Sequence, residues 1–421
     1  MSSLLKGIRV LEFGQLLNPA SLGMYLADLG ADVIKVESPF LGDYMRDVGF
    51  LVKPGVAILH LQASKNKRSV SIDLRDPDGR DTFWRLLESS DVFIEGAVAG
   101  AADRLGIGYE QQKLHKPDIV FCHFSGFGGT GPYAQVPTHG LMMGALVGQM
   151  PYERGPDGLV HPFEPEEPGT ERGGDASAAG AVNAALGVAA ALVQRERTGE
   201  GAFIDVASSD GVMAQAWFVL SAHLNREIVN ARVVPPRKGG ELTGARYSCY
   251  ETRDGHIALL CAIEPKFWRK FCAAIERPEL EVQGDGTDFL DYGSSQSLRH
   301  ELTEIFLERD LEEWMRIASE HDIPLGPASK TIEEVVANEH VRARGLIVEA
   351  QERDAGPFTY VTSAIHVEGQ SNAVRLPAPH LGEHTREVLH SLGIDDAELL
   401  RMEADGVIGF ERMVPNDNAG S

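Results

Sequence analysis

Asp175 is the residue that its neighbours best equip to act as a nucleophile. It follows Gly173 and Gly174 and precedes a run of small residues, 176–192, that is typical of a buried helix. An aspartate before a helix faces free backbone N–H groups and the positive end of the helix dipole, so it stays ionised. The glycines would let a ligand approach closely. Asp175 could be a catalytic carboxylate or only a helix cap, and these residues alone leave both readings open.

A second group of residues could bind an anion. Lys65, Lys67, Arg68 and Arg75 fall within a stretch of eleven residues, and Arg104 follows a later predicted strand. Arginine and lysine near strand ends can bind phosphates through charge-assisted hydrogen bonds. The alternative is a solvated charged face of the protein.

Two further side chains could transfer protons. His139 lies beside Gly140, and Glu264 precedes Pro265 at the start of a predicted helix. Each has a structural alternative, because a lone histidine often serves packing and a glutamate at a helix start favours the helix dipole. The glycine-rich loop at 125–132 could wrap a ligand or form a plain surface turn.

Composition narrows the classes of function. A chain of 421 residues is too long for one ordinary core, so we expect two or more domains. The net charge of -23 argues against a binder of nucleic acid or of an anionic membrane surface. The four cysteines are scattered without metal spacing and no signal peptide is evident, which predicts a cytoplasmic protein with free thiols and no metal. The apolar run at 178–193 is expected to be too short and too poor in bulky residues to span a membrane.

The first part of the chain predicts an α/β fold with a parallel sheet. Apolar strands alternate with helices over about 125 residues, which is the pattern of an open α/β sheet. The GxGxxG fingerprint is missing, so a nicotinamide cofactor is poorly supported. Ligands in such sheets bind at the carboxyl ends of the strands, which here include Gln15, Leu16 and Gly96. The predicted strands are 7–13, 33–37, 69–74, 91–95, 119–124 and 202–206, with helices at 20–29, from 76, at 176–192 and at 210–223.

The second part of the chain predicts a smaller α+β domain. Residues 233–244 have the composition of a linker, and a hairpin turn at 253–255 joins two short strands. The remaining predicted helices are 265–275, 298–308, 311–321, 331–342 and 386–392.

Several motifs together resemble the family III CoA-transferases of the CaiB/BaiF type, a superfamily that also contains α-methylacyl-CoA racemase. The match runs from about residue 7 to residue 410. The matching stretches are 27–37, Gly42-Asp43 with Arg46, Asn66–Ser69 with Asp73-Leu74, 104–109, 125–132, Gly174-Asp175, 198–201, 376–379 and 381–385.

The resemblance implies a particular architecture. Residues 1–225 would form the N-terminal part of a Rossmann-like large domain that binds CoA, and residues 331–421 would return to complete it. Residues 226–330 would form the inserted small domain. The family also forms homodimers whose two chains interlock, which the sequence alone would not suggest because threaded topologies are rare.

The resemblance also implies the reaction and its residues. The partners would be an acyl-CoA and a free carboxylic acid, with CoA as substrate and product and no permanently bound cofactor. Asp175 would be the nucleophile that forms acyl-aspartyl anhydride and aspartyl-CoA thioester intermediates. The residues expected at the CoA site are Gln15, Leu16, Lys67, Arg68, Ile72, Arg75, Gly96 and Arg104.

Two alternatives stay open. A racemase of the same superfamily would use Asp175 and His139 as an acid/base pair, with Glu264 in its Glu-Pro motif. The histidine motif is only partly kept, because Gly140 replaces its aspartate. A CoA-binding protein without turnover is the third possibility, because residues 95–100 depart from the family pattern at the CoA site.

Overall fold

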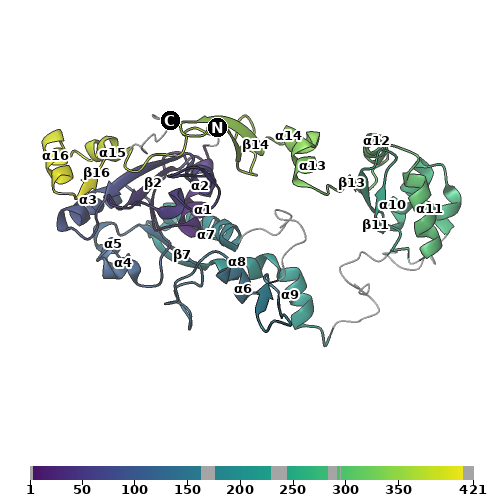
Figure 1. The fold of residues 1–421 in the computed structure, drawn as a ribbon, viewed down its shortest axis with the longest axis horizontal. Helices are drawn as coiled ribbons and strands as arrows, with labels where there is room; N and C mark the ends of the chain where they lie inside the picture. Colours follow the sequence, from purple (N-terminus) through teal and green to yellow (C-terminus); the bar gives the residue numbers. More distant parts are fainter. Residues whose placement is uncertain (1–2, 163–175, 229–243, 283–291, 294, 411–421) are drawn as a thin grey trace. The chain divides into compact units, whose positions relative to one another are not determined.

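The computed structural model of the protein describes residues 3–162, 176–228, 244–282, 292–293 and 295–410 (Figure 1). The chain divides into two units. The larger unit takes residues 1–221 and 340–421, so it is built from both ends of the chain, and the smaller unit takes residues 222–339. The divisions predicted at 225/226 and 330/331 remain predictions about folding domains.

A seven-stranded sheet forms the centre of the larger unit. Every neighbouring pair of strands is parallel except the last, which is antiparallel. The predicted mixed α/β class with a parallel-dominated sheet is therefore confirmed. The strands lie in the order β10 (Ala202–Ala207), β7 (Val120–Ser125), β6 (Val92–Glu95), β1 (Arg9–Phe13), β2 (Asp32–Glu37), β5 (Lys67–Ile72) and β16 (Ile408–Gly409).

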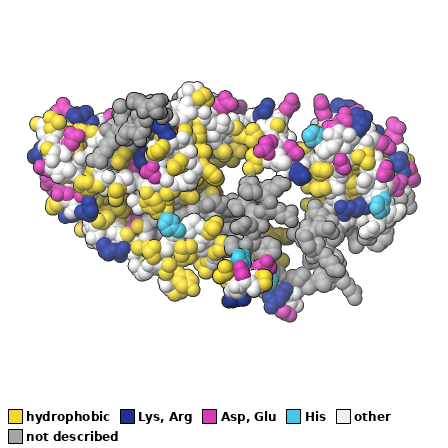
Figure 2. Space-filling model, viewed as in Figure 1, with side chains coloured by type: hydrophobic (Ala, Val, Ile, Leu, Met, Phe, Trp, Pro, Cys, Tyr) yellow, Lys and Arg dark blue, Asp and Glu magenta, His cyan; other side chains and the backbone are white. Residues whose placement is uncertain are grey.

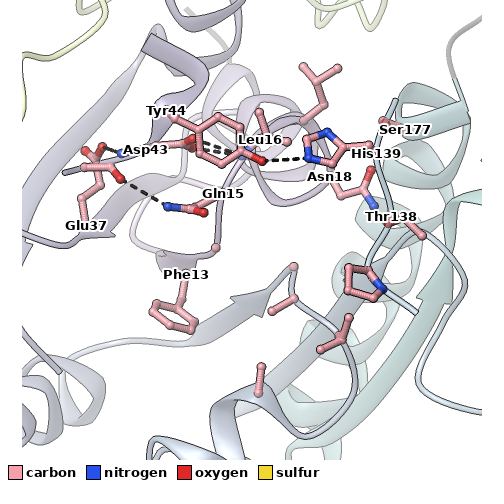
Figure 3. A pocket seen from close by; sticks show the side chains of 18 of the residues that line it. Phe13, Gln15, Leu16, Asn18, Glu37, Asp43, Tyr44, Thr138, His139 and Ser177 are labelled. Carbon is pink, nitrogen blue, oxygen red and sulfur yellow. Dashed lines mark hydrogen bonds between the residues drawn. The ribbon is translucent and has the colours of Figure 1, made fainter. Parts of the chain in front are cut away.

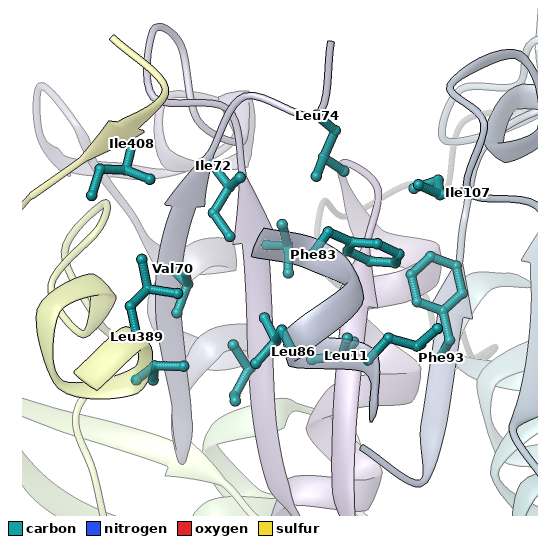
Figure 4. Packing of buried hydrophobic residues seen from close by; sticks show 14 of the residues in the cluster. Leu11, Val70, Ile72, Leu74, Phe83, Leu86, Phe93, Ile107, Leu389 and Ile408 are labelled. Atoms are coloured by element: carbon teal, nitrogen blue, oxygen red, sulfur yellow. The ribbon is translucent and has the colours of Figure 1, made fainter. Parts of the chain in front are cut away.

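Helices cover both faces of this sheet. Successive strand side chains point to opposite faces, so Val10 packs with α1 (Leu17–Asp28) and α7 (Ala176–Thr198), whereas Leu11 packs with the opposite layer. Figure 4 shows that opposite layer, in which Phe83 and Leu86 lie against the strands. Its helices are α3 (Pro77–Glu88), α5 (Tyr109–His115), α15 (Thr385–Ser391) and α16 (Asp396–Ala404).

The small-residue helix α7 is long and closely packed. It crosses α8 (Ser208–Gln215) where Gly180 meets Gly211, and a Cβ added at Gly211 would lie 2.6 Å from the Cα of Gly180. The expectation that this apolar run is too short for a membrane span is wrong, because the helix continues to Thr198 and reaches 23 residues. By length and composition it could cross a membrane, but half of its apolar window is buried inside the larger unit.

The C-terminal segment completes the larger unit. The backbone N–H of Asn66, the residue before β5, donates to the carbonyl oxygen of Leu376 (2.9 Å). The N–H of Ser71 in β5 donates to the hydroxyl oxygen Oγ1 of Thr385 (3.0 Å). Sequence patterns indicated only one helix in this segment. The structure adds α16, β16 and a hairpin of β14 (Ile347–Glu352) and β15 (Gly356–Val361).

The smaller unit has its own core. Phe306 lies between Tyr250, with ring centroids 4.6 Å apart, and Trp314, with centroids 4.5 Å apart. A hairpin and three helices surround this core as predicted, and one further short strand joins the sheet. The elements are β11 (Tyr247–Glu251), β12 (Ile257–Cys261), β13 (Leu325–Pro327), α10 (Pro265–Ala274), α11 (Gln296–Phe306) and α12 (Leu311–His321).

Two predicted helices are interrupted. The helix expected at 210–223 is α8 followed by α9 (Trp217–Leu224), and the helix expected at 331–342 is α13 (Ile332–Ala337) followed by α14 (Glu339–Ala343). Asn338 adopts an extended backbone (φ −63°, ψ 125°), which ends α13. The short elements are η1 (Tyr44–Arg46), β3 (Leu51–Lys53), β4 (Val56–Ala57), α2 (Ile58–Ser64), α4 (Ala101–Arg104), α6 (Met142–Leu146), β8 (Tyr152–Arg154), β9 (Val160–Pro162) and η2 (Pro278–Val282).

Candidate active site

A cavity of about 500 Å³ opens at the carboxyl ends of β1, β2 and β6 in the larger unit. This is where ligands bind in open α/β sheets. Figure 3 shows side chains from the β1–α1 connection, from the segment after β2 and from the loop before α6 facing one another across it. Its lining includes Phe13, Gln15, Leu16, Asn18, Glu37, Asp43, Tyr44, Gly96, Val98, Thr138, His139, Met143 and Ser177.

Gln15 and Leu16 form the wall of the cavity where β1 ends. The side chain of Gln15 donates to the carbonyl oxygen of Gly42 (3.4 Å). Leu16 has φ 62° and ψ −157°, a backbone conformation that is almost confined to glycine. Its N–H donates to both carboxylate oxygens of Asp43, at 3.1 and 3.2 Å. The wall is therefore strained and held by a side chain from another connection.

Two buried carboxylates, those of Asp43 and Glu37, lie beside this wall. Glu37 accepts from the guanidinium group of Arg46 at 2.8 Å and from the hydroxyl of Ser69 at 2.6 Å. Burial opposes the ionisation of Glu37, but the positive charges of Arg46 and Lys35 outweigh it and hold the pKa of this carboxyl below its usual value. Glu37 thus stays charged at neutral pH.

His139 and Tyr44 place two polar groups at the cavity. The Tyr44 hydroxyl lies 3.5 Å from Nε2 of His139, and their rings are tilted with centroids 6.3 Å apart. Burial and the nearby charge of Asp43 raise the pKa of Tyr44, so its hydroxyl is neutral and can donate. Both side chains are exposed, which leaves this pair open to a ligand.

The predicted nucleophile lies next to this site in sequence. Asp175 itself, with Gly173 and Gly174, lies outside the described residues. Helix α7 begins at Ala176, and Ser177, two residues beyond Asp175, lines the cavity. The start of α7 is therefore a wall of the same cavity that Gln15, Leu16, Gly96 and His139 line.

Lys67 and Arg68 are engaged in ion pairs. Lys67 is fully buried, and its Nζ donates to Glu12 (2.6 Å) and to the carbonyl oxygen of Ala20 (2.8 Å). Arg68 holds Asp32 through two nitrogens, at 2.9 and 2.5 Å, and a third reaches Glu387 at 3.0 Å. These partners occupy the groups that were expected to meet CoA.

The other predicted CoA-site residues outside the cavity lie in different settings. The side chain of Arg75 is 68% exposed and pairs with Asp73 at 2.8 Å. Arg104 is exposed at the end of α4. Ile72 is buried in the sheet core and pairs with β16. Arg75 and Arg104 thus present guanidinium groups to solvent, whereas Ile72 does not present its side chain.

Glu264 lies in the smaller unit. It is the residue before α10, with an extended backbone, and Pro265 takes the first helical position. This is the structural role that its sequence also allowed. Among the described residues, no group of three or more His, Cys, Asp or Glu side chains is arranged to hold a metal ion.

The cavity residues that sequence reasoning did not assign to the site include Tyr44 and Ser177. Each had a usable signal, because Tyr44 follows Asp43 in a matching motif and Ser177 lies within two residues of Asp175. Neither type is diagnostic of chemistry alone, and only the fold brings both to one cavity.

Known proteins resemble the whole chain. The profile of CoA-transferase family III matches residues 5–385. A succinyl-CoA–D-citramalate CoA-transferase of Chloroflexus aurantiacus is 30% identical over 96% of this chain and 98% of its own length. Human alpha-methylacyl-CoA racemase is 28% identical over 96% of this chain and 97% of its own length.

The fold has a counterpart among solved structures. A crystal structure of a CAIB/BAIF family protein from Brucella suis superimposes with a TM-score of 0.67 at 26% identity, covering 93% of this chain and all of the other.

Proposed function

The chain belongs to CoA-transferase family III, and we propose that it moves CoA from an acyl-CoA thioester to a free carboxylic acid with Asp175 as nucleophile. One observation carries the proposal. The cavity at the strand ends is lined by Gln15, Leu16 and Gly96, predicted for CoA, and by Ser177 at the start of the helix that follows Asp175. This lining supports a site at which the CoA thioester and the Asp175 carboxylate would meet.

The first half of the reaction removes CoA from the donor. The Asp175 carboxylate attacks the thioester carbonyl and expels CoA thiolate, which leaves an acyl-aspartyl anhydride. The thiolate then attacks the aspartyl carbonyl of that anhydride. The donor leaves as a free carboxylate, and the enzyme holds CoA as an aspartyl thioester.

The second half repeats these steps with the acceptor. Its carboxylate attacks the aspartyl thioester and expels the thiolate, which forms a second anhydride. The thiolate attacks the acyl carbonyl of this anhydride, which releases the new acyl-CoA and regenerates the Asp175 carboxylate. Water would hydrolyse each intermediate, so the apolar side chains of Leu16, Val98 and Met143 favour transfer by limiting its access.

Arg75 and Arg104 are the basic residues that we assign to the phosphates of CoA. Their exposed positions support this, because the Arg75 guanidinium is 68% exposed and its ion pair with Asp73 is therefore weak enough for a phosphate to compete. Lys67 is enclosed, so a role in the protein's own charge balance suits it better.

We also propose a homodimer. Apolar side chains cover broad areas of the larger unit (Figure 2), and three consecutive residues of α9 are more than half exposed. They are Trp217 (66%), Phe218 (65%) and Val219 (61%). Large apolar side chains exposed together on one helix favour an interaction surface there.

A racemase is the second candidate because His139 faces the cavity. Its imidazole could remove or return a proton at the α-carbon of an acyl-CoA, with Asp175 on the other side. The similarity to human alpha-methylacyl-CoA racemase gives this route its weight.

One experiment tests these functions. The protein is incubated in D₂O with succinyl-CoA, and separately with a 2-methylacyl-CoA, each with and without a free acid such as D-citramalate. CoA moved to the acid supports the transferase. Deuterium at the α-carbon without transfer supports the racemase, and binding without either change leaves a CoA-binding protein.

Asp175→Ala tests the nucleophile. We expect transfer to stop and a hydroxylamine-sensitive adduct, which maps to Asp175 in the parent protein, to disappear. Transfer by the variant at the parent rate would overturn the mechanism.

A further inference from the structure

Four buried charged side chains form a connected row beneath the cavity wall formed by Gln15 and Leu16. Lys67 Nζ lies 2.6 Å from one oxygen of Glu12, and Lys35 Nζ lies 2.8 Å from the other. Lys35 also lies 2.9 Å from Asp43. All four side chains are essentially inaccessible to solvent, and the strand register sets Glu12 directly beside Lys35.

The last of these four charged side chains, Asp43, bonds to the strained residue of the wall, Leu16. Asp43 accepts the backbone N–H of Leu16 with both oxygens and that of Met45 at 2.9 Å. The conformation of Leu16 persists in a non-glycine residue only when its surroundings over-determine it. Asp43 is the group that bonds its N–H, so the buried charges act on the wall through this carboxylate.

The alternating charges make the arrangement self-consistent. A buried charge that loses its partner is strongly destabilising, and here each ammonium lies between carboxylates or backbone oxygens. Burial opposes ionisation of Asp43, but Lys35 and the two backbone amides outweigh it and hold the pKa of this carboxyl below its usual value. Helix α1 leaves room for the pair of Glu12 and Lys67 only because residue 23 is glycine, where a Cβ would lie 1.9 Å from Glu12 Oε2.

We propose that Asp43 is a positioning residue, which holds Leu16 in its strained conformation and thereby fixes the cavity wall formed by Gln15 and Leu16. Glu12 and Lys35 hold Asp43 in turn. Lys67 completes their charge balance rather than meeting a phosphate of CoA. The catalytic consequence rests on the proposed transferase function, whereas the structural coupling between Asp43 and Leu16 does not.

A double-mutant cycle tests this coupling. Asp43→Asn removes the charge and leaves a single amide oxygen, so we expect kcat/KM to fall about tenfold or more, because a charge-assisted bond is lost and the wall moves. Leu16→Gly removes the strain that Asp43 opposes. The variant carrying both changes should therefore regain at least half of the decrease in log(kcat/KM) that Asp43→Asn causes.

Leu16→Ala is the matched control, because it shortens the side chain and keeps the backbone restriction of a Cβ. Combined with Asp43→Asn it should give no recovery. Asp395→Asn controls for loss of a carboxylate that caps a helix elsewhere, at α16. It should leave transfer unchanged.

Two readouts do not depend on catalysis. The unfolding temperature and the hydrogen exchange of residues 14–20 should show the same coupling, with exchange faster in Asp43→Asn and no further effect of the charge change in the Leu16→Gly background. These readouts keep the test valid if the protein transfers no CoA or if Asp43→Asn is poorly folded. Independent effects of the two changes in every readout, or equal recovery by Leu16→Ala, would overturn the proposal.

Discussion

Residues of the cavity differ in how firmly they are held. Glu37 and Asp43 are buried and bound by several donors, so they are fixed in place beside the wall formed by Gln15 and Leu16. His139 and Tyr44 are exposed and share one long hydrogen bond of 3.5 Å. Fixed carboxylates suit a scaffold, whereas the exposed pair is available to touch the acyl group.

His139→Gln separates positioning from proton transfer. The proposed transfer moves no proton through His139, so we expect the transfer rate to fall less than tenfold, whereas a general acid or base contributes roughly 10²–10⁴-fold. The rate is measured by chromatography of acyl-CoA products, with Tyr44→Phe as the control that removes the partner hydroxyl. A loss of a hundredfold or more in His139→Gln alone would identify His139 as an acid/base group.

Part of the site followed from the sequence at this scale. Gln15, Leu16 and Gly96 were found because strand ends of a parallel sheet share one edge. Lys67 could not be assigned in the same way. Its partner Glu12 lies 55 residues earlier, and only strand register shows that this lysine is enclosed rather than facing solvent.

At the scale of elements, the crossing of α7 and α8 helps to hold the first turn of α7 in place at the cavity. Close approach of the two helices requires small residues on both, which explains the glycine at position 180 of the small-residue run. The small-residue run predicted the helix, but neither its length of 23 residues nor the interruption of the following helix at Ala216 was visible in the sequence pattern.

Gly180→Ala tests the crossing. A Cβ there would lie 2.6 Å from the ring of Phe124 and 2.8 Å from the Cα of Ser208, so we expect the free energy of unfolding to fall by about 1–3 kcal/mol. Gly187→Ala in the same helix is the control, because its Cβ would meet only the Ile204 side chain, at 3.3 Å. Both are measured by urea denaturation, and equal stability of the two variants would contradict the role given to this crossing.

At the scale of the whole molecule, buried ionisable groups tie stability to pH. Burial and the charge of Arg46 hold the pKa of His60 well below its usual value, so His60 is neutral in the folded protein and protonated in the unfolded chain below about pH 6.5. The unfolded chain then binds the extra proton, and stability falls as the pH falls.

The carboxylates add a second acid step. The folded-state pKa values of Glu37 and Asp43 are lowered, so their contribution is complete above about pH 4 and is lost as the pH falls through the folded values. We expect urea midpoints to decrease below about pH 6.5 and more steeply below about pH 4. Asp43→Asn should weaken only the lower step, and a midpoint that stays constant from pH 7 to pH 3 would contradict this account.

The overall division of the chain was harder to predict than the sheet. The alternation of strands and helices identified the parallel core, because each strand–helix–strand repeat is local in sequence. The contacts of the C-terminal segment, such as Thr385 on Ser71, join residues 314 positions apart, and no local pattern carries that information. Strand β16 has only two residues, too few for a periodic signal.

Strand β16 and the helices beside it have a consequence for synthesis. The ribosome makes β5 long before the C-terminal segment that pairs with its free edge. At about 5–20 residues per second, the 314 positions from Ser71 to Thr385 take roughly 15–60 s to translate. Throughout that interval the nascent sheet presents an unpaired edge and an uncovered apolar face, on which another chain could pair. The smaller unit, residues 222–339, is made within the same interval, so all of its residues exist before the segment that covers this edge.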